Sequence, residues 1–396
     1  MPDESLIRAL LLPELSLLSF RPIPSARVIE VIAEKHRKRE FCPVCAAPSE
    51  VGYDRRFVRL KDENFRGYRV HLVVRKRRLW CRPCSKPFTE PLPGVRKGFQ
   101  HTERYGRAVL RACERYVDLS HVRRDFRCSA GWLYTALYRH LDLEHRKRRP
   151  DWPTVVGLDE HCFGRRKPLC PRDFVSMVVD VRGRRLFELV DGRTIESLEA
   201  SLGHVKGAEN VRLVTLDMSD AYKGFAKRTF PNARLVADKF HVLRLLNPAL
   251  TQRRIEVTGD RRSMAIRRLL LRNGHSLDFW KRLDVQRFLD AHPALREVYL
   301  AKEALHRFYR TRGIDRATRA FDGLLDRLKA SALPELATLR RTLTKWRNEV
   351  LAYFDTGLTN AITEGFNLKA KLVKRRAFGY RSFRNYRLRL LNACAS

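Results

Sequence analysis

The pattern of apolar and polar residues predicts two kinds of region along the chain. Apolar, β-branched runs that predict buried strands fall within residues 154–237, whereas residues 247–350 carry only the periodicity of helices. Strand-like runs also occur between residues 41 and 92, and residues 100–146 are predicted to be helical. We therefore expect a multidomain α/β protein.

The strands of the central region follow a particular order. Arg182-Gly183-Arg184 predicts a hairpin between the second and third strands, and helices follow the third, fourth and fifth. The predicted strands are 154–161, 174–180, 186–190, 211–216 and 233–237. Three meandering strands followed by strand–helix alternation are typical of a ribonuclease H-like core, a mixed sheet with flanking helices. The helical residues 247–350 would then be an insertion in this core.

Three acidic residues occupy the positions that a metal-dependent nuclease needs. Asp159 and Asp217 end apolar runs, so their carboxylates would leave the sheet while the backbone stays fixed. Glu364 begins a basic helix, with Asn367 and Lys371 on the same face. Three such carboxylates can hold two divalent cations about 4 Å apart, which drive in-line phosphoryl transfer. We expect Asp159, Asp217 and Glu364 to be catalytic Mg²⁺ ligands, against the alternative that each is an ordinary surface or capping residue.

Other polar residues lie close to these acids. Strand alternation puts Glu160 on the face opposite Asp159 and predicts a supporting or salt-bridged role for it. Asp220 is expected to begin the helix that follows Asp217. Asp238 and His241 follow the last strand one helical turn apart, where they either line the edge of the site or only cap a helix.

Cys42, Cys45, Cys81 and Cys84 form two C-x-x-C pairs separated by 35 residues. Each pair puts two thiolates on a tight turn, and two such turns complete a tetrahedral Zn²⁺ site. A redox motif is the alternative, but it explains only one pair. The remaining cysteines are expected to be structural or incidental: Cys113, Cys128, Cys162, Cys170 and Cys394.

Two short helices resemble a helix-turn-helix. Residues 118–126 and 130–143 are joined by Arg127-Cys128-Ser129, and Ser129 can cap the second helix. The second helix would lie in the major groove of DNA. Any two-helix elbow of a small α domain is the alternative.

The charge of the chain indicates a polyanionic partner. Lys and Arg total 81 against 44 Asp and Glu, a formal net charge of +37, while 44% of the residues are hydrophobic. We expect nucleic-acid binding, with ribosome association or simple solubilisation as alternatives. The sequence contains no apolar run long enough to span a membrane and no predicted signal peptide. The odd number of cysteines favours a reducing compartment, so we expect a cytoplasmic protein.

These patterns divide the chain into six parts. We expect an N-terminal segment (1–40), a zinc ribbon (41–92), a helix-turn-helix DNA-binding domain (100–149), the first part of the ribonuclease H-like core (154–246), a helical insertion (247–350), and the last helix of the core with a basic tail (351–396). A helix over 340–354 and a last helix over 360–376 are predicted near the end.

Taken together, these motifs resemble the transposases of the ISL3 family of bacterial insertion sequences over nearly the whole length. The segments that carry the resemblance, besides the cysteine pairs and the helix-turn-helix, are Gly157-Leu-Asp-Glu160, Leu216-Asp-Met-Ser-Asp-Ala-Tyr222, Ala237-Asp-Lys-Phe-His-Val242, Thr359-Asn-Ala-Ile-Thr-Glu-Gly-Phe-Asn367, Lys374-Arg-Arg376 and Gly379-Tyr-Arg-Ser-Phe383. Leu158 and Ala361 stand where the family more often has Ile and Gly, and both changes leave the acids in place.

The resemblance implies a DDE transposase with Asp159, Asp217 and Glu364 as its triad. Such an enzyme binds the terminal inverted repeats of its element, cleaves DNA with two Mg²⁺ or Mn²⁺ ions, and joins the freed 3′-hydroxyl to target DNA. Because two element ends must be joined, a homodimer or higher oligomer is expected on the double-stranded DNA, in the bacterial cytoplasm with the nucleoid. A structure-specific endonuclease on the same core and a non-cutting DNA-binding regulator derived from a transposase are the alternatives.

Overall fold

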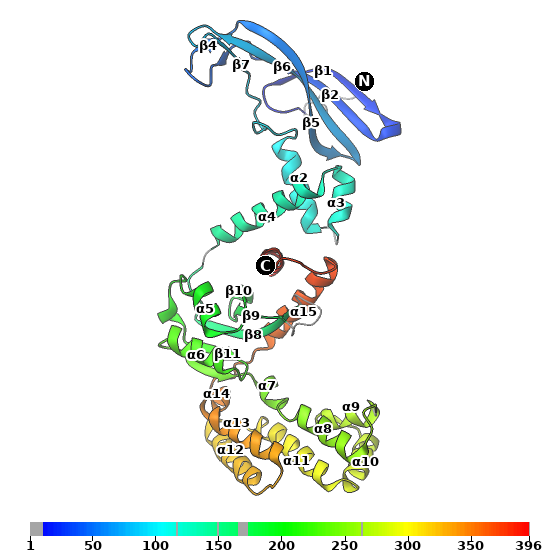
Figure 1. Cartoon of the computed structure of the whole chain (residues 1–396), viewed down its shortest axis with the longest axis vertical. Coiled ribbons are helices and arrows are strands. Elements are labelled where there is room, and N and C mark those ends of the chain that lie inside the picture. Colours follow the sequence, from blue (N-terminus) through cyan, green and yellow to red (C-terminus); the bar gives the residue numbers. More distant parts are fainter. Residues whose placement is uncertain (1–10, 116–117, 149, 165–172, 263, 396) are drawn as a thin grey trace. The chain divides into compact units, whose positions relative to one another are not determined.

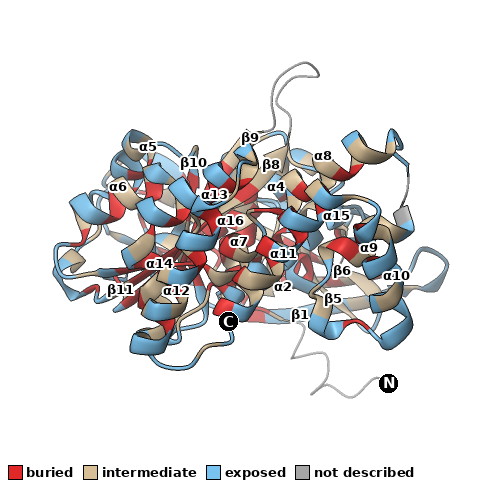
Figure 2. Cartoon of the chain, turned by 90° about the horizontal axis from the view of Figure 1, so that it is seen from below, coloured by how far each residue is buried: buried red, intermediate tan, exposed pale blue. Residues whose placement is uncertain are grey.

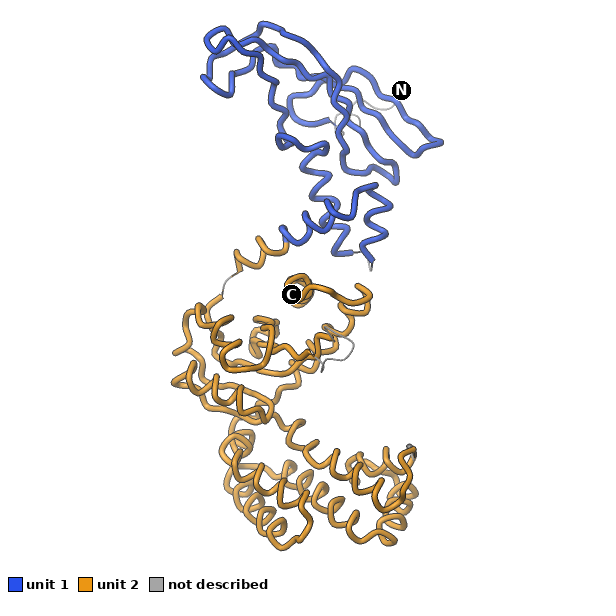
Figure 3. The backbone as a smooth tube through the Cα atoms, in the orientation of Figure 1, with its two compact units in different colours: residues 1–140 blue, residues 141–396 orange. Residues whose placement is uncertain are grey.

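The chain forms two compact units, residues 1–140 and 141–396 (Figure 3). The computed structural model describes residues 11–115, 118–148, 150–164, 173–262 and 264–395. Sheets and helices occur together, which confirms the predicted mixed α/β class. None of the helices in the described ranges combines the length and the apolar character needed to cross a membrane.

The first unit has a five-stranded sheet in the order β1-β2-β6-β5, with β7 paired to β6. Its strands are β1 (Leu15–Ile23), β2 (Val28–Lys35), β5 (Gly52–Phe65), β6 (Tyr68–Cys81) and β7 (Lys86–Thr89). β5 and β6 form a long antiparallel hairpin, with Arg66 and Gly67 at positive φ in its turn. Because β2 pairs in parallel with β6, the segment before residue 40 and the cysteine-containing segment share one sheet.

Three helices follow this sheet: α2 (Glu103–Arg115), α3 (Leu119–Phe126) and α4 (Ala130–Lys147). The two helices predicted around residue 128 are thus present. Asp118 caps α3 by accepting a hydrogen bond from the Ser120 amide, and Arg127 ends the helix in the left-handed region. Ser129 accepts from the Trp132 amide at 3.3 Å, as expected for the start of α4.

The second unit has a five-stranded sheet in the order β10-β9-β8-β11-β12 (Figure 1). Its strands are β8 (Val155–Gly164), β9 (Asp173–Asp180), β10 (Arg185–Asp191), β11 (Leu213–Leu216) and β12 (Arg234–Ala237). β9 is antiparallel to β8 and β10, whereas β11 is parallel to β8 and β12. The predicted meander followed by strand–helix alternation is therefore present.

Helices cover both faces of this sheet. On one face, Val156, Leu158 and Val214 pack with α5 (Ile195–Leu202) and α6 (Asp220–Thr229). On the other face, Val175 and Met177 pack with α15 (Ala361–Arg376) and α16 (Phe383–Ala393). The short helix α7 (Lys239–Leu243) follows β12. Figure 2 colours the buried residues of the chain in red.

Between α7 and α15, the described residues form α-helices and one short 3-10 helix (Gly274–Ser276), without a strand. The helices are α8 (Asn247–Thr258), α9 (Met264–Leu271), α10 (Phe279–Asp290), α11 (Pro293–Phe308), α12 (Ile314–Lys329), α13 (Pro334–Lys345) and α14 (Arg347–Thr356). α14 packs against β12 and so returns the chain to the sheet.

Two predictions about the helices near the end of the chain are wrong. The helix predicted over 340–354 is broken at Trp346, whose backbone leaves the helical region (φ −107°, ψ 17°) while its buried ring packs under Lys223. α15 is not the last helix, because the predicted basic tail contains α16. Ser382 caps α16, and Tyr386 and Leu390 are buried on its inner face.

Candidate active site

Three parallel strands bring an aspartate each to one place in the second sheet, directly after the ends of β11 and β12 and midway along β8. Leu158 on β8 and Ala237 on β12 both lie in register with Leu216 on β11. The next residue in each strand direction is an aspartate: Asp159, Asp217 and Asp238. Register between neighbouring strands thus brings together acids that lie far apart in the sequence.

Asp159 and Asp217 form a cluster with His241. One carboxylate oxygen of each acid and one ring nitrogen of His241 all lie within 4.8 Å of one another. His241 comes from the first turn of α7, where Asp238 accepts hydrogen bonds from its backbone amide (3.3 Å) and its Nδ1 (2.8 Å). Because Nδ1 is engaged with Asp238, Nε2 is the nitrogen available to a ligand.

Burial governs the electrostatics of this cluster. It raises the pKa of Asp159 to about 6 and the pKa of Asp217 to about 7. Hydrogen bonding to Asp238 raises the pKa of His241. Burial opposes ionisation of Asp238, but hydrogen bonds from His241 and Asn360 outweigh it and lower the pKa of that carboxyl.

One carboxylate oxygen of Asp217 indicates that this site binds a cation or water. Its Oδ1 is buried and has no hydrogen-bond partner among the residues that the structure describes. A buried carboxylate oxygen without a donor is costly unless a cation or water satisfies it. Hard oxygen ligands of this kind suit Mg²⁺ or Mn²⁺, so the residues present fit a divalent cation.

Glu364 is not part of this cluster. It lies in the first turn of α15 with 45% of its side chain exposed, and its Oε1 lies 3.8 Å from Nη2 of Arg244. Asn367, one helical turn later, donates from Nδ2 to Oδ2 of Asp159 at 2.9 Å. On the predicted face of α15, therefore, the side-chain amide of Asn367 contacts the site, whereas the carboxylate of Glu364 lies near Arg244.

The beginning of α15 is tied to the sheet by Asn360. Its backbone amide donates to Asp238 at 3.1 Å, and its side-chain amide donates to the Leu158 carbonyl at 3.3 Å. Thr363 donates to the side-chain carbonyl of Asn360. Gly157 makes this approach possible, because a Cβ there would lie 2.9 Å from Asn360 Oδ1 and 3.3 Å from Thr363 Oγ1.

The polar neighbours named from the sequence have structural roles. Glu160 pairs with Arg193 at 3.0 Å, which confirms the expected salt bridge, and its negative charge helps to raise the pKa of Asp217 and of Asp159. Asp220 is the first residue of α6, as expected, and pairs with Lys345. The sequence pointed to His241 through its spacing from Asp238 and through the segment Ala237–Val242 that carries part of the family resemblance. Nothing in it pointed to Tyr386, which lies in the helix that was not predicted and contacts His161.

The four cysteines of the two C-x-x-C pairs meet in the first unit. Their sulfurs all lie within 4.8 Å of one another, with 3.4 Å between Cys45 and Cys81 and 3.9 Å between Cys42 and Cys84. Zn–S bonds of about 2.3 Å in a tetrahedron place sulfurs about 3.8 Å apart. Backbone amides of Cys45 and Val44 lower the pKa of Cys42 to about 7, which favours the thiolate. This cluster therefore fits Zn²⁺.

The described cysteines that were expected to be structural or incidental are not members of this cluster. Cys113 is buried in α2 and Cys394 is buried directly after α16, while Cys128 and Cys162 are half-buried. Cys170 lies outside the described residues.

An arginine-lined hollow of about 830 Å³ lies where α3 meets α4. Its lining residues are Ser120, Arg123, Arg124, Arg127, Cys128 and Ser129. The hollow is wide and open, and guanidinium groups bind phosphate oxygens. The feature therefore suits an extended polyanion better than a small ligand.

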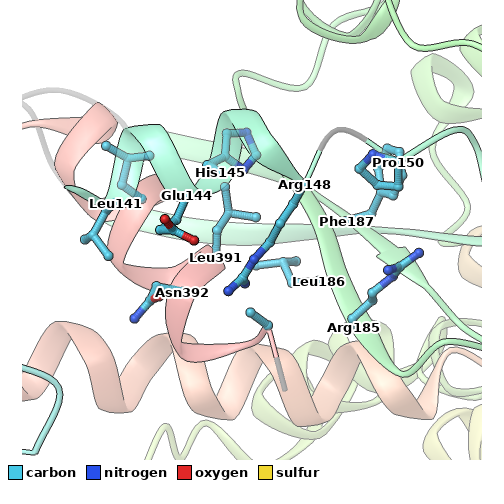
Figure 4. Close-up of a pocket in the computed structure, with 12 residues that line it drawn as sticks. Leu141, Glu144, His145, Arg148, Pro150, Arg185, Leu186, Phe187, Leu391 and Asn392 are labelled. Carbon is cyan, nitrogen blue, oxygen red and sulfur yellow. The ribbon is translucent and has the colours of Figure 1, made fainter. Parts of the chain in front are cut away.

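A smaller cavity of about 90 Å³ lies between the end of α4, β10 and α16 (Figure 4). Beside it, Arg387 of α16 forms an ion pair with Glu188 of β10 and contacts His145. None of the residues of the carboxylate cluster lines this cavity. Its ion pair joins α16 to the sheet.

Comparison with known proteins gives consistent matches. The profile of the DDE transposases of ISL3 type, described as "Transposase", matches residues 156–390. The transposase for insertion sequence element IS1001 of Bordetella parapertussis is 27% identical over 372 residues, covering 91% of this chain and 90% of that protein. The transposase for insertion sequence element IS1557 of Mycobacterium tuberculosis is 24% identical over 259 residues, 57% of each chain.

Proposed function

The chain belongs to the ISL3 family of insertion-sequence transposases, and we propose that it binds the terminal inverted repeats of its element and catalyses DNA cleavage and strand transfer. The observation that carries this proposal is the meeting of Asp159, Asp217 and His241, whose ligand atoms lie within 4.8 Å of one another. The strand order of the second unit supports a ribonuclease H-like core around them. The unpartnered Oδ1 of Asp217 supports a cation at that place.

In this proposal Asp159, Asp217 and Glu364 are the ligands of the catalytic cations. Asp159 and Asp217 are held by the sheet, whereas Glu364 is exposed and turned toward Arg244. Residues one helical turn apart have Cβ atoms only about 5–6 Å apart. Since Asn367 already contacts Asp159, Glu364 would reach the site by leaving Arg244 and changing its side-chain rotamer. His241, fixed by Asp238, would offer a further ligand nitrogen or a hydrogen-bond donor to the scissile phosphate.

A pair of Mg²⁺ or Mn²⁺ ions, when bound, would supply an activated water oxygen and stabilise the charge that develops on the leaving oxygen. The protein residues would hold the phosphodiester in line and exclude competing water around the buried acids. Cleavage would leave a 3′-hydroxyl on the element end, and this hydroxyl would attack the target DNA.

The first unit would recognise the element ends. Cys42, Cys45, Cys81 and Cys84 would hold a structural Zn²⁺ that joins the β3–β4 ribbon (Glu40–Phe41 and Pro48–Ser49) to the end of β6. The arginines around the α3–α4 turn would contact DNA phosphates. We further propose a homodimer or higher oligomer on DNA, because two element ends must be joined, in the cytoplasm with the nucleoid.

The test is a cleavage and strand-transfer assay with labelled element ends and Mg²⁺. The wild-type protein should produce both nicked ends and joined products. Asp217→Asn and Glu364→Gln should bind the ends but cut neither strand, while Asp220→Asn, an exposed acid three residues from Asp217, should cut normally. Cutting without joining would make the protein a structure-specific endonuclease, and binding without cutting would make it a regulator. Undiminished cleavage by Asp217→Asn would refute the assignment of that residue.

A further inference from the structure

A chain of hydrogen bonds leads from α16 to the cluster. The Tyr386 hydroxyl contacts Nε2 of His161 at 2.7 Å, and Nδ1 of His161 contacts Oδ1 of Asn367 at 2.9 Å. Nδ2 of Asn367 then contacts Oδ2 of Asp159 at 2.9 Å. Four side chains from β8, α15 and α16 thus form one connected path that ends on a carboxylate oxygen of Asp159.

The donors and acceptors along this path allow one arrangement when Asp159 is ionised and the His161 ring is neutral. A carboxylate only accepts, so Asn367 must present its NH₂ group to Asp159 and its carbonyl oxygen to His161. Nδ1 of His161 must then carry the proton and donate it. The lone pair of Nε2 is left to accept from the Tyr386 hydroxyl. Every group on the path is satisfied, and the identity of each group fixes the orientation of the next.

We propose that Tyr386 and His161 are positioning residues that orient Asp159 through Asn367 toward the cations it would hold. The inference rests on the proposed function, because it assigns these residues a task at the proposed metal site. Neither residue touches the cluster directly, so their effect is on the direction in which Asp159 presents its oxygens. Hydrogen-bonding partners behind metal ligands have this effect on affinity in other metal sites.

The surroundings keep this path rigid. His161 and Tyr386 are buried, and Tyr386 packs in the core between the sheet and α16. The neighbouring Arg387 donates from Nε to Glu188 on β10 at 2.7 Å, which fixes α16 against the sheet. A fixed helix gives the hydroxyl a fixed position, and the path transmits that position to Asp159.

The same path sets the rotation of α15. Asn367 lies three residues after Glu364, on the same helical face. Holding Asn367 between His161 and Asp159 therefore also fixes the direction from which the Glu364 side chain leaves the helix. We expect the path to position two of the three proposed ligands, one directly and one through the helix that carries it.

The alternative is that these buried polar groups only satisfy one another in the core. Metal affinity separates the two, because a merely structural network does not change it. We would titrate the full-length protein with Mn²⁺ and follow binding by electron paramagnetic resonance, using Tyr386→Phe and the matched control Tyr309→Phe. Tyr309 is a buried tyrosine of the helical insertion whose hydroxyl has no hydrogen-bond partner among the described residues.

We expect Tyr386→Phe to weaken Mn²⁺ binding about tenfold, the lower end of the effect of such partners, and Tyr309→Phe to leave it unchanged. End binding should be unaffected, and excess Mn²⁺ should restore cleavage by Tyr386→Phe. His161→Asn keeps an amide donor near the position of Nδ1 and should bind Mn²⁺ more tightly than His161→Leu, which gives a second measurement if Tyr386→Phe does not fold.

The outcomes distinguish the two proposals. Unchanged Mn²⁺ affinity in Tyr386→Phe and equal affinities of the two His161 variants, with a wild-type protein that binds Mn²⁺ and cuts, would overturn the positioning role alone. A wild-type protein that binds no Mn²⁺, or binds it as well after Asp217→Asn, would overturn the metal site and the positioning role with it.

Discussion

Replacing Asp217 by asparagine should make the metal-free protein more stable at alkaline pH, although it removes a residue of the proposed site. Burial raises the pKa of Asp217 from 3.8 to about 7, and its Oδ1 has no hydrogen-bond partner among the described residues. The folded protein therefore holds this proton more tightly than the unfolded chain does. The stability that this bound proton contributes is fully present below about pH 4 and is lost as the pH rises to about 7.

The magnitude follows from the pKa. Each tenfold change in acid dissociation is worth about 1.4 kcal/mol, so raising the pKa from 3.8 to about 7 corresponds to about 4 kcal/mol. Water reaches part of the half-buried residue, so we take about half of this value, about 2 kcal/mol at pH 8. Divalent cations should reverse the order, because an ion at about one hundred times its dissociation constant stabilises the wild type by about 2.7 kcal/mol and Asp217→Asn should lose this gain.

The assay is urea denaturation of both proteins at pH 4 and pH 8, with EDTA and with Mg²⁺. Asp217→Asn should be the more stable protein at pH 8 in EDTA, equal to the wild type at pH 4, and unresponsive to Mg²⁺. Asp220→Asn is the control, since that exposed acid forms a surface ion pair with Lys345 and its replacement should change stability by less than about 1 kcal/mol. An Asp217→Asn protein that is less stable in EDTA at pH 8 and still gains from Mg²⁺ would refute this reasoning.

Three further predictions concern other parts of the chain. Cys45→Ser should lose zinc and lower the melting temperature of the first unit, whereas Cys113→Ser, outside the sulfur cluster, should keep its metal in elemental analysis. Gly157→Ala should destabilise the protein by about 1–3 kcal/mol in urea, because its Cβ would meet Asn360 at 2.9 Å; Gly365→Ala, with open space at its Cβ, should instead stabilise α15 by up to about 1 kcal/mol. Arg124→Ala should reduce the salt dependence of end binding by about one in the log–log slope, and an unchanged slope would exclude a phosphate contact.

The sequence predicted the elements whose signals are local. The apolar runs before Asp159 and Asp217 form strands, the Arg182–Arg184 turn joins β9 to β10, and the cysteine pairs converge. The strands and the turn are indicated by a few neighbouring residues, whereas the two cysteine pairs, 35 residues apart, were joined by the four ligands that a tetrahedral Zn²⁺ site needs. Strand order could also be predicted, because alternation of strands and helices restricts how a chain can form a sheet.

The sequence did not predict features that depend on distant packing. α16 carries four arginines in and beside it, which obscure the spacing of Tyr386 and Leu390, and its burial follows from a sheet face more than 190 residues earlier. The helix breaks at Trp346 because the indole ring packs in the interior beside Lys223, and this contact lies far away in the sequence. The partnership of His241 with Asp159 and Asp217 depends on the register of β12 beside β11, and the orientation of Glu364 toward Arg244 is a rotamer that no sequence pattern encodes.

The hydrogen bond between Asp238 and Asn360 closes a loop of 122 residues that contains the whole helical insertion. The entropy of closing a loop rises only with the logarithm of its length, and doubling the loop costs only about 0.6 kcal/mol. Gain or loss of helical hairpins far from this closing point would therefore hardly alter the free energy of bringing β12 and α15 together. Relatives can be expected to differ widely in the length of this segment while keeping the residues on either side of the junction at the same separation.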